Sequence, residues 1–250
     1  MKRMLAITAL LLAALPGVAQ SRRANALDFA SDFLTLPVAA NLPGLNGTFL
    51  TYLAIQNPTA SAYNVTATFY DASGAPRTAT IALAAGQVKT FANFLQEVFN
   101  TTGGGSVTFS APESAGGTHN NRFIISSEVR TSGTHFSTTV PVLEFAGSNS
   151  RAFAPGITID ANSRTNAGCF NQSDSTNVVT LTALDASGHA TGNATTLTLL
   201  PHAWGQTSIT QSMTNGAVQF DPTDSAVCYA VVVENATGDG RYVSATEYKP

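Results

Sequence analysis

Charged side chains are scarce in this chain. Lysine and arginine together number 12 and aspartate and glutamate 15 in 250 residues, so only 11% of the residues are charged, whereas about 25% is usual in soluble proteins. A chain with so few basic residues lacks the positive patches that bind nucleic acid or anionic lipid, and no nucleic-acid partner is expected. Its surface must be built largely from Thr, Ser, Asn and Gly, which fits an extracellular β-protein.

Long apolar runs are absent beyond the N-terminus, so no transmembrane anchor is expected. Two basic residues precede an apolar run from Leu5 to Leu15, and Pro16-Gly17-Val18-Ala19 follows it. This layout is typical of a secretory signal peptide over residues 1–19, cleaved before Gln20 or, as an alternative, after Ala24-Asn25-Ala26. A buried N-terminal helix is less favoured, because nothing else predicts a core to receive it. We expect a protein that is secreted, displayed at the cell surface or held in the periplasm.

One short motif occurs twice. Asp71-Ala72-Ser73-Gly74 returns as Asp185-Ala186-Ser187-Gly188, 114 positions later. Asp can accept hydrogen bonds from its own backbone and Gly tolerates positive φ, so the motif predicts a tight turn between two strands. Similar strand-like segments surround both copies. The sequence therefore predicts two units, over residues 27–145 and 150–250.

Apolar and polar residues alternate in many short segments of both units. In the first unit the predicted strands cover 48–56, 63–70, 78–83, 107–110, 123–130 and 135–140. In the second they cover 165–171, 178–184, 195–200, 203–209, 217–220, 228–234 and 241–246. Helical spacing over 91–99 predicts one or two turns of helix, ended by Gly103 to Gly105. Seven or eight short strands per unit predict antiparallel β-sandwiches, and the lack of helices between strands argues against a parallel α/β fold.

A family resemblance rests on several of these turns and strand edges. Leu36-Pro37-Val38-Ala39-Ala40, Gln56-Asn57-Pro58 and the first Asp-Ala-Ser-Gly turn resemble immunoglobulin-like β-sandwich repeats of secreted, mostly uncharacterised bacterial proteins. The second unit is similar through Asn171 and Val233-Glu234-Asn235-Ala236-Thr237-Gly238-Asp239. The resemblance implies an all-β fold of two tandem antiparallel immunoglobulin-like β-sandwiches. It implies no catalytic residues.

Only two cysteines are present, Cys169 and Cys228. An even pair in an exported chain predicts a disulfide, with two separate buried thiols as the alternative. In the immunoglobulin-like fold that the resemblance implies, the two positions face each other across the core. Aligning Gly133 with Gly238 places Ile55 and Phe123 at the corresponding points of the first unit.

The only tryptophan, Trp204, can be placed by the repeat. If the second unit carries two extra residues in its turn, Ile81, Leu83 and Val88 match Leu197, Leu199 and Trp204 at a common offset of 116. This match predicts Trp204 in the core of its unit. Stacking on a sugar ring is the alternative.

Residues that could carry chemistry show no pattern typical of a catalytic or metal site. The histidines are spread along the chain, and the three aspartates considered for calcium are better explained by turns. Ser106 follows two glycines but lacks the second flanking glycine of a nucleophile elbow. No two glutamates stand out as a glycosidase pair. The residues considered are His119, His135, His189, His202, Asp221, Asp224, Asp239, Glu97, Glu113, Glu128, Glu144, Glu234 and Glu247. No catalytic residue, cofactor site or metal site is predicted.

The sequence thus favours an exported, non-enzymatic protein that serves structure, adhesion or spacing, with an unknown protein or glycan partner. A module that binds carbohydrate or peptide outside the cell is the alternative. A periplasmic chaperone or a hydrolase is less favoured, since the basic pair of the one and the catalytic cluster of the other are not evident.

Overall fold

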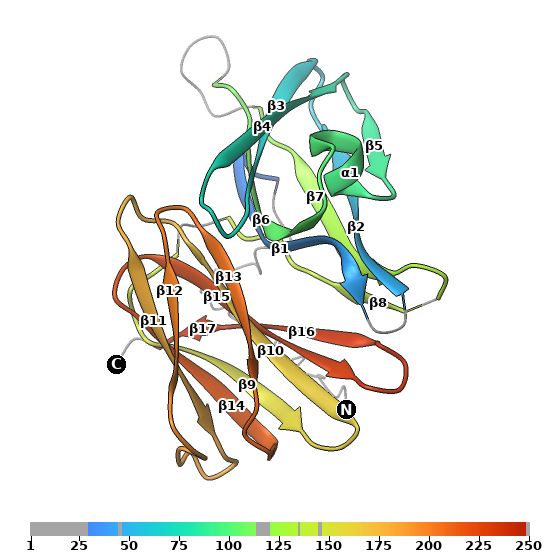
Figure 1. Ribbon diagram of the computed structural model, residues 1–250. Helices are drawn as coiled ribbons and strands as arrows, with labels where there is room; N and C mark the ends of the chain where they lie inside the picture. The colour runs from blue at the N-terminus through green and yellow to red at the C-terminus, as the bar shows by residue number, and fades with distance from the viewer. Residues whose placement is uncertain (1–29, 45–46, 114–120, 135, 145–146, 249–250) are drawn as a thin grey trace, which may run out of the picture.

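The computed structural model of the protein describes residues 30–44, 47–113, 121–134, 136–144 and 147–248. Over these residues the chain is antiparallel β-structure with one short helix (Figure 1), so the all-β prediction is confirmed. The predicted signal peptide over 1–19 lies outside the described residues. In the described part of the chain, no helix combines the length and apolar character needed to cross a bilayer.

The strands form two sets, which we call unit 1 and unit 2. Unit 1 contains β1 (Phe33–Gly44), β2 (Gly47–Gln56), β3 (Tyr63–Tyr70), β4 (Pro76–Leu83), β5 (Val88–Phe91), α1 (Phe94–Phe99), β6 (Gly103–Ser110), β7 (Ile124–Thr131) and β8 (Ser137–Thr139). Unit 2 contains β9 (Ala152–Ile159), β10 (Ser163–Asn171), β11 (Asn177–Leu184), β12 (Thr195–Leu199), β13 (Trp204–Ile209), β14 (Met213–Pro222), β15 (Ala226–Glu234), β16 (Gly240–Ser244) and β17 (Thr246–Glu247). Named strands pair only within their own unit among the described residues. The predicted boundaries, 27–145 and 150–250, stay a prediction.

Unit 1 is built from one continuous sheet in the order β4-β3-β6-β1-β2-β7-β8, with β5 paired to β2. The long strand β1 joins its two halves, because residues 33–41 pair with β6 and residues 41–44 pair with β2. A register shift between Leu36 and Ala39, within the pairing with β6, bends β1. The halves and α1 share one apolar core, which includes Val65 and Phe109 from one half, Ile55 from the other, and Phe94 from the helix.

The helix α1 is shorter than the predicted segment 91–99 and begins after Asn93. The Asn93 side chain accepts a hydrogen bond from the Gln96 amide, and the Glu97 carboxylate accepts one from the Asn93 amide, so both ends of this capping arrangement are satisfied. Asn100, at a positive φ of 50°, ends the helix. Phe91 belongs instead to β5, where it pairs with β2.

The prediction that Gly103 to Gly105 end the helix is wrong, because Asn100 ends it. The three glycines begin β6 and pair with β1. Glycine is required there by close contacts rather than by flexibility: a Cβ on Gly105 would lie 2.3 Å from the Phe69 ring, and one on Gly104 would lie 2.9 Å from the ring of Trp204.

Unit 2 consists of two packed sheets. One has the order β13-β10-β15-β16 and the other β12-β11-β14-β9-β17. Their facing side chains form a core that includes Ala167 and Ala230 from the first sheet and Val179, Leu181 and Phe220 from the second. Figure 1 shows the yellow-to-red strands of this unit beside the blue-to-green strands of unit 1.

Equivalent strands of the two units pair in equivalent registers. Val65 lies opposite Ile81 in unit 1, and Val179 lies opposite Leu197 in unit 2. The two residues on the first strand are 114 positions apart, and those on the second strand are 116 apart. The second unit therefore carries two extra residues in the turn between these strands, as the sequence predicts.

A buried asparagine network is also duplicated. Asn57 in unit 1 and Asn171 in unit 2 are both fully buried. The Asn57 side chain donates to the Ser61 and Ala84 carbonyls, and the Asn171 side chain donates to the equivalent Ser175 and Leu200 carbonyls. Because an unpaired buried amide is costly, these bonds fix the loop that follows each strand.

Cys169 and Cys228 form a disulfide, but not across the core. They lie directly opposite each other on β10 and β15, neighbouring strands of one sheet, with their Cα atoms 4.1 Å apart. The position expected from the immunoglobulin-like resemblance is therefore wrong. The alignment of Phe123 with Cys228 is also wrong, because Ile55 lies opposite Ile125 at the equivalent place in unit 1.

Candidate functional site

The candidate functional site is the junction between the two units. Its unit 2 side is the outer face of the β13-β10-β15-β16 sheet, called the junction face here. Strand β15 is apolar along its length because both of its faces are covered: Cys228 and Ala230 face the core of unit 2, whereas Tyr229 and Val231 pack against the core cluster of unit 1. A strand with both faces covered is expected to be continuously apolar. This run of apolar residues is the feature of the sequence that indicates the junction. The sequence analysis did not use it, and the junction was not predicted.

Tyr229 lies at the centre of the junction and is fully buried. Its ring stacks on Tyr242 of β16, with the ring centroids 5.3 Å apart. Burial raises the pKa of the Tyr229 hydroxyl well above its ordinary value, and Tyr242 adds to the rise. The hydroxyl is therefore held in its neutral, hydrogen-bonding form.

A directed chain of hydrogen bonds runs through this hydroxyl. The Trp204 indole Nε1 donates to Tyr229 Oη over 3.0 Å, and Tyr229 Oη donates to Gln206 Oε1 over 2.9 Å. An indole N–H can only donate, so the tyrosine must accept from it and use its single proton for Gln206. The chain thus fixes which atom of the Gln206 amide is the oxygen.

Trp204 lies at this junction, so its predicted place in the core of unit 2 is wrong. Its ring packs against unit 1, close to Gly104 and Leu42. Val88, the residue that matches Trp204 by strand register, is also outside a core and is 54% exposed. The offset of 116 is confirmed, because Val88 and Trp204 occupy equivalent strand positions. The inference that these positions lie in the core of each unit is wrong.

The first Asp-Ala-Ser-Gly turn docks on unit 2. The Trp204 amide donates to the Asp71 carbonyl over 3.1 Å, and Gly74 lies against the Pro201 carbonyl so closely that a Cβ would come within 2.1 Å of it. The Asp71 carboxylate accepts hydrogen bonds from Ser73, whose hydroxyl lowers the pKa of Asp71. The tight turn thus presents a backbone carbonyl to the neighbouring unit.

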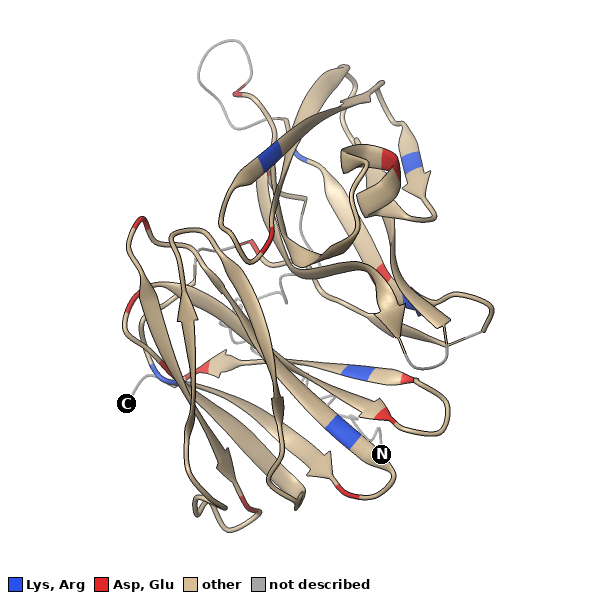
Figure 2. Cartoon of the chain, viewed as in Figure 1, with Lys and Arg blue, Asp and Glu red and all other residues tan. Residues whose placement is uncertain are grey.

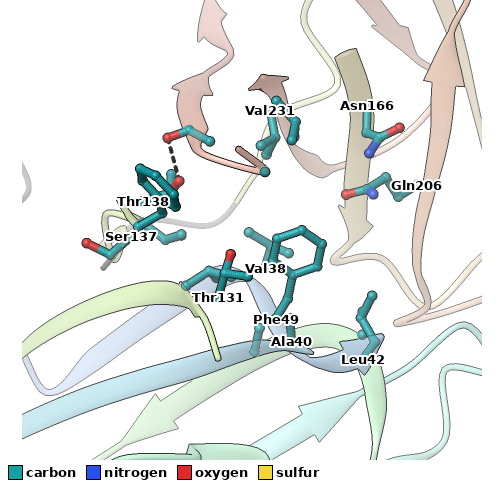
Figure 3. A pocket seen from close by; sticks show the side chains of 18 of the residues that line it. Val38, Ala40, Leu42, Phe49, Thr131, Ser137, Thr138, Asn166, Gln206 and Val231 are labelled. Carbon is teal, nitrogen blue, oxygen red and sulfur yellow. Dashed lines mark hydrogen bonds between the residues drawn. The ribbon is translucent and has the colours of Figure 1, made fainter. Parts of the chain in front are cut away.

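A pocket of about 140 Å³ opens at the junction (Figure 3). Strands of unit 1 supply Val38, Leu42 and Phe49, and strands of unit 2 supply Val231 together with the side-chain amide of Gln206. A hydrogen bond between the Thr138 hydroxyl and the Gly240 carbonyl joins the units at one side. Among the described residues that line the pocket, none has an ionisable side chain.

The histidines and aspartates considered for a metal are not brought together. His202 contacts Asp174 and the Tyr70 ring, and His189 lies beside Asp185. His119 and His135 lie outside the described residues. Asp221 pairs with Arg151, Asp224 accepts from the Ser175 hydroxyl, and Asp239 accepts from the Gly240 amide, each in a separate contact. In the described part of the chain, no three metal-binding side chains form a group.

The possible nucleophile and several of the carboxylates have structural contacts. Ser106 is fully buried and its hydroxyl donates to the Pro37 carbonyl, 2.5 Å away. Glu97 caps α1, Glu128 pairs with Arg130, and Glu234 accepts from the Thr237 hydroxyl. The sequence predicts no catalytic residue among them, and this stays a prediction.

Charge is sparse over both units, and Figure 2 shows most of each drawn in the colour of uncharged residues. The junction is accordingly held by apolar packing and by hydrogen bonds between neutral groups. Such contacts respond little to salt, because screening acts on charges.

Comparisons with known proteins assign no family. No family model matches the chain, and no curated protein matches it. Among solved structures, the crystal structure of PBSX exported protein XepA is similar over 88% of this chain and 78% of that chain, at 11% sequence identity and a TM-score of 0.28. A similarity this weak carries no functional argument.

Proposed function

We propose that the protein is an exported, non-enzymatic structural protein in which two immunoglobulin-like β-units act as one body in adhesion or spacing. The observation that carries the proposal is the covered junction face. Tyr229, Val231 and Val233 would expose a large apolar surface if unit 2 stood alone. A contact of this kind favours a fixed arrangement of the units over a flexible tether.

The disulfide supports the exported part of this proposal. Disulfides such as Cys169–Cys228 persist in oxidising compartments and are rare in the cytosol. The predicted leader over 1–19 is consistent with the same route.

Two measurements test the proposal. Expression of the full chain in a bacterium, followed by fractionation and N-terminal sequencing, should recover exported protein that starts at Gln20 and has no free thiol when denatured. Hydrogen exchange under increasing denaturant should then show both units opening in one cooperative transition. Protein retained in the cytosol would contradict export, and two separate transitions would contradict the single body.

The second candidate is an extracellular module that binds carbohydrate or peptide. The junction pocket is the observation that favours it, because the side-chain amides of Asn166 and Gln206 bring polar hydrogen atoms to an apolar pocket. A glycan array and a peptide panel, each screened with the mature protein, test this candidate. Binding that persists after Val231→Phe fills the pocket would place the ligand elsewhere.

A further inference from the structure

We propose that the junction pocket binds a small uncharged molecule that has a compact apolar body and one hydrogen-bond acceptor, such as a carbonyl oxygen. This inference goes beyond the structural role proposed above. It does not depend on whether the protein serves adhesion or spacing.

The volume of the pocket and its apolar lining determine the size and the apolar character of the ligand body. The pocket measures about 140 Å³, and a cavity of about 150 Å³ lined by apolar side chains in another protein holds benzene. Val38, Leu42 and Phe49 line one side and Val231 the other (Figure 3). A six-membered ring or a branched chain of similar volume fits this space.

Two side-chain amides are the reason to expect a hydrogen-bond acceptor on the ligand. Gln206 Oε1 already accepts from the Tyr229 hydroxyl, and Asn166 Oδ1 accepts from the Ser208 hydroxyl over 2.9 Å. Each oxygen therefore accepts one hydrogen bond from the protein, whereas in the described structure neither amide nitrogen has a protein acceptor. Figure 3 shows Asn166 and Gln206 together at one edge of the pocket. Gln206 is exposed and Asn166 is half-buried, so both amides can donate N–H groups at this edge to an acceptor on a ligand.

The described lining also favours an uncharged ligand. Its described residues have no ionisable side chain, so a carboxylate or an ammonium group would enter with no opposite charge to pair with. Burying an unpaired charge is far more costly than burying a carbonyl that accepts hydrogen bonds. A neutral ligand follows.

The single tryptophan provides a local reporter. Trp204 gives the only indole N–H resonance of the chain, and this N–H is bonded through Tyr229 to Gln206. Three probes share one ring and differ in the tested property: cyclohexanone has the acceptor, cyclohexane lacks it, and cyclohexanecarboxylate adds a charge. Each is titrated into ¹⁵N-labelled mature protein while the indole resonance is followed.

Cyclohexanone should shift the indole resonance saturably, and its Kd should be at least about tenfold lower than that of either other probe, the factor that one hydrogen bond of ordinary strength supplies. Equal affinity for cyclohexane and cyclohexanone would overturn the assigned acceptor. Tighter binding of the carboxylate would overturn the neutral ligand. No saturable shift with any probe would overturn the site.

Variants at equivalent strand positions locate the effect. Gln206→Glu keeps an oxygen for the Tyr229 hydroxyl but removes the amide donor, so it should weaken cyclohexanone binding at least about tenfold. Thr90→Glu makes the same acid at the equivalent position of unit 1 and should leave binding unchanged. Val231→Phe, checked for native circular dichroism, should abolish binding by filling the pocket. Unchanged binding in Gln206→Glu would contradict the proposal even if Val231→Phe did not fold.

Discussion

Two equivalent sheet faces of this molecule have diverged in opposite directions. By strand register, Ser126 and Glu128 of unit 1 correspond to Tyr229 and Val231 of unit 2. The unit 1 face carries a Glu128–Arg130 ion pair at 3.0 Å and lies open, whereas the unit 2 face is apolar and covered. The pairing of the strands is shared, so it does not explain the difference between the two faces. The difference is explained by contact with the neighbouring unit, which covers only the unit 2 face.

The two Asp-Ala-Ser-Gly turns differ in the same way. Both adopt positive φ at their glycine, 74° at Gly74 and 81° at Gly188. A Cβ on Gly74 would clash with the Pro201 carbonyl, whereas a Cβ on Gly188 would meet nothing within 4 Å. One turn has become part of the junction and its copy has stayed a surface turn.

The largest effect is expected from exchanging a junction residue for its counterpart. Tyr229→Ser removes a fully buried ring together with its hydrogen bonds to Trp204 and Gln206, and should lower the free energy of unfolding by about 3 to 5 kcal/mol. Urea unfolding followed by circular dichroism measures it. Ser126→Ala, at the exposed equivalent position, should change stability by less than about 0.5 kcal/mol. Similar losses in both variants would remove the distinction between the faces.

The next largest effect concerns a pair of residues on neighbouring strands that forms a disulfide in unit 2 and consists of two isoleucines, Ile55 and Ile125, in unit 1. The double substitution Cys169→Ala and Cys228→Ala opens a loop of 59 residues and should lower the unfolding free energy by about 4 kcal/mol in the chain-entropy description. Denaturant curves with and without dithiothreitol measure it. The reductant should have no effect on the double variant, and stability of the unchanged protein that is insensitive to reduction would contradict the expectation.

A smaller effect separates the two turns. Gly188→Ala should lose about 1 to 2 kcal/mol because an L-residue is strained at that φ. Gly74→Ala meets the same strain and also pushes against Pro201, so it should lose at least about 1 kcal/mol more. Thermal unfolding of the two variants compares them directly. Equal losses would show that the first turn is not held by unit 2.

The smallest effect near neutral pH comes from the buried tyrosines. Burial raises the pKa of Tyr63 in unit 1 to about 12, and it raises the pKa of Tyr229 and Tyr242 at the junction. The unfolded chain releases these protons from about pH 10, so stability should be unaffected below that pH and should fall as pH rises through the raised values. Tyrosinate absorbance and circular dichroism should change together. Ionisation of Tyr229 without loss of structure, seen by tyrosine NMR signals, would contradict its burial.

The strands and their pairing could be predicted because they depend on local alternation. Val65, Ala67 and Phe69 are all buried, and the polar residues between them are not, as a period of two predicts. The offset of 116 and the disulfide partners also followed from the sequence. Alignment by the loop glycines failed for Ile125, since Gly133 and Gly238 do not occupy equivalent points of their loops.

The junction could not be predicted in the same way. A residue such as Val231 has the same chemistry whether it packs inside its own unit or against a neighbour. The unbroken apolar run from Ala226 to Val233 indicates that both faces of the strand are covered, but it does not say by what. Only the three-dimensional arrangement shows unit 1 as the cover, and with it the pocket and the amide donors.

The position of β15 near the C-terminal end of the chain has a consequence for biosynthesis. Unit 1 leaves the ribosome and any export channel first, and N-terminal units generally fold first. Its open face, with Glu128 and Arg130, needs no partner in water. The apolar face of β15 then emerges when unit 1 has already folded and can cover it. We expect this order to shorten the time during which Tyr229 and its neighbours are exposed to aggregation, and exchanging the order of the units would remove that protection.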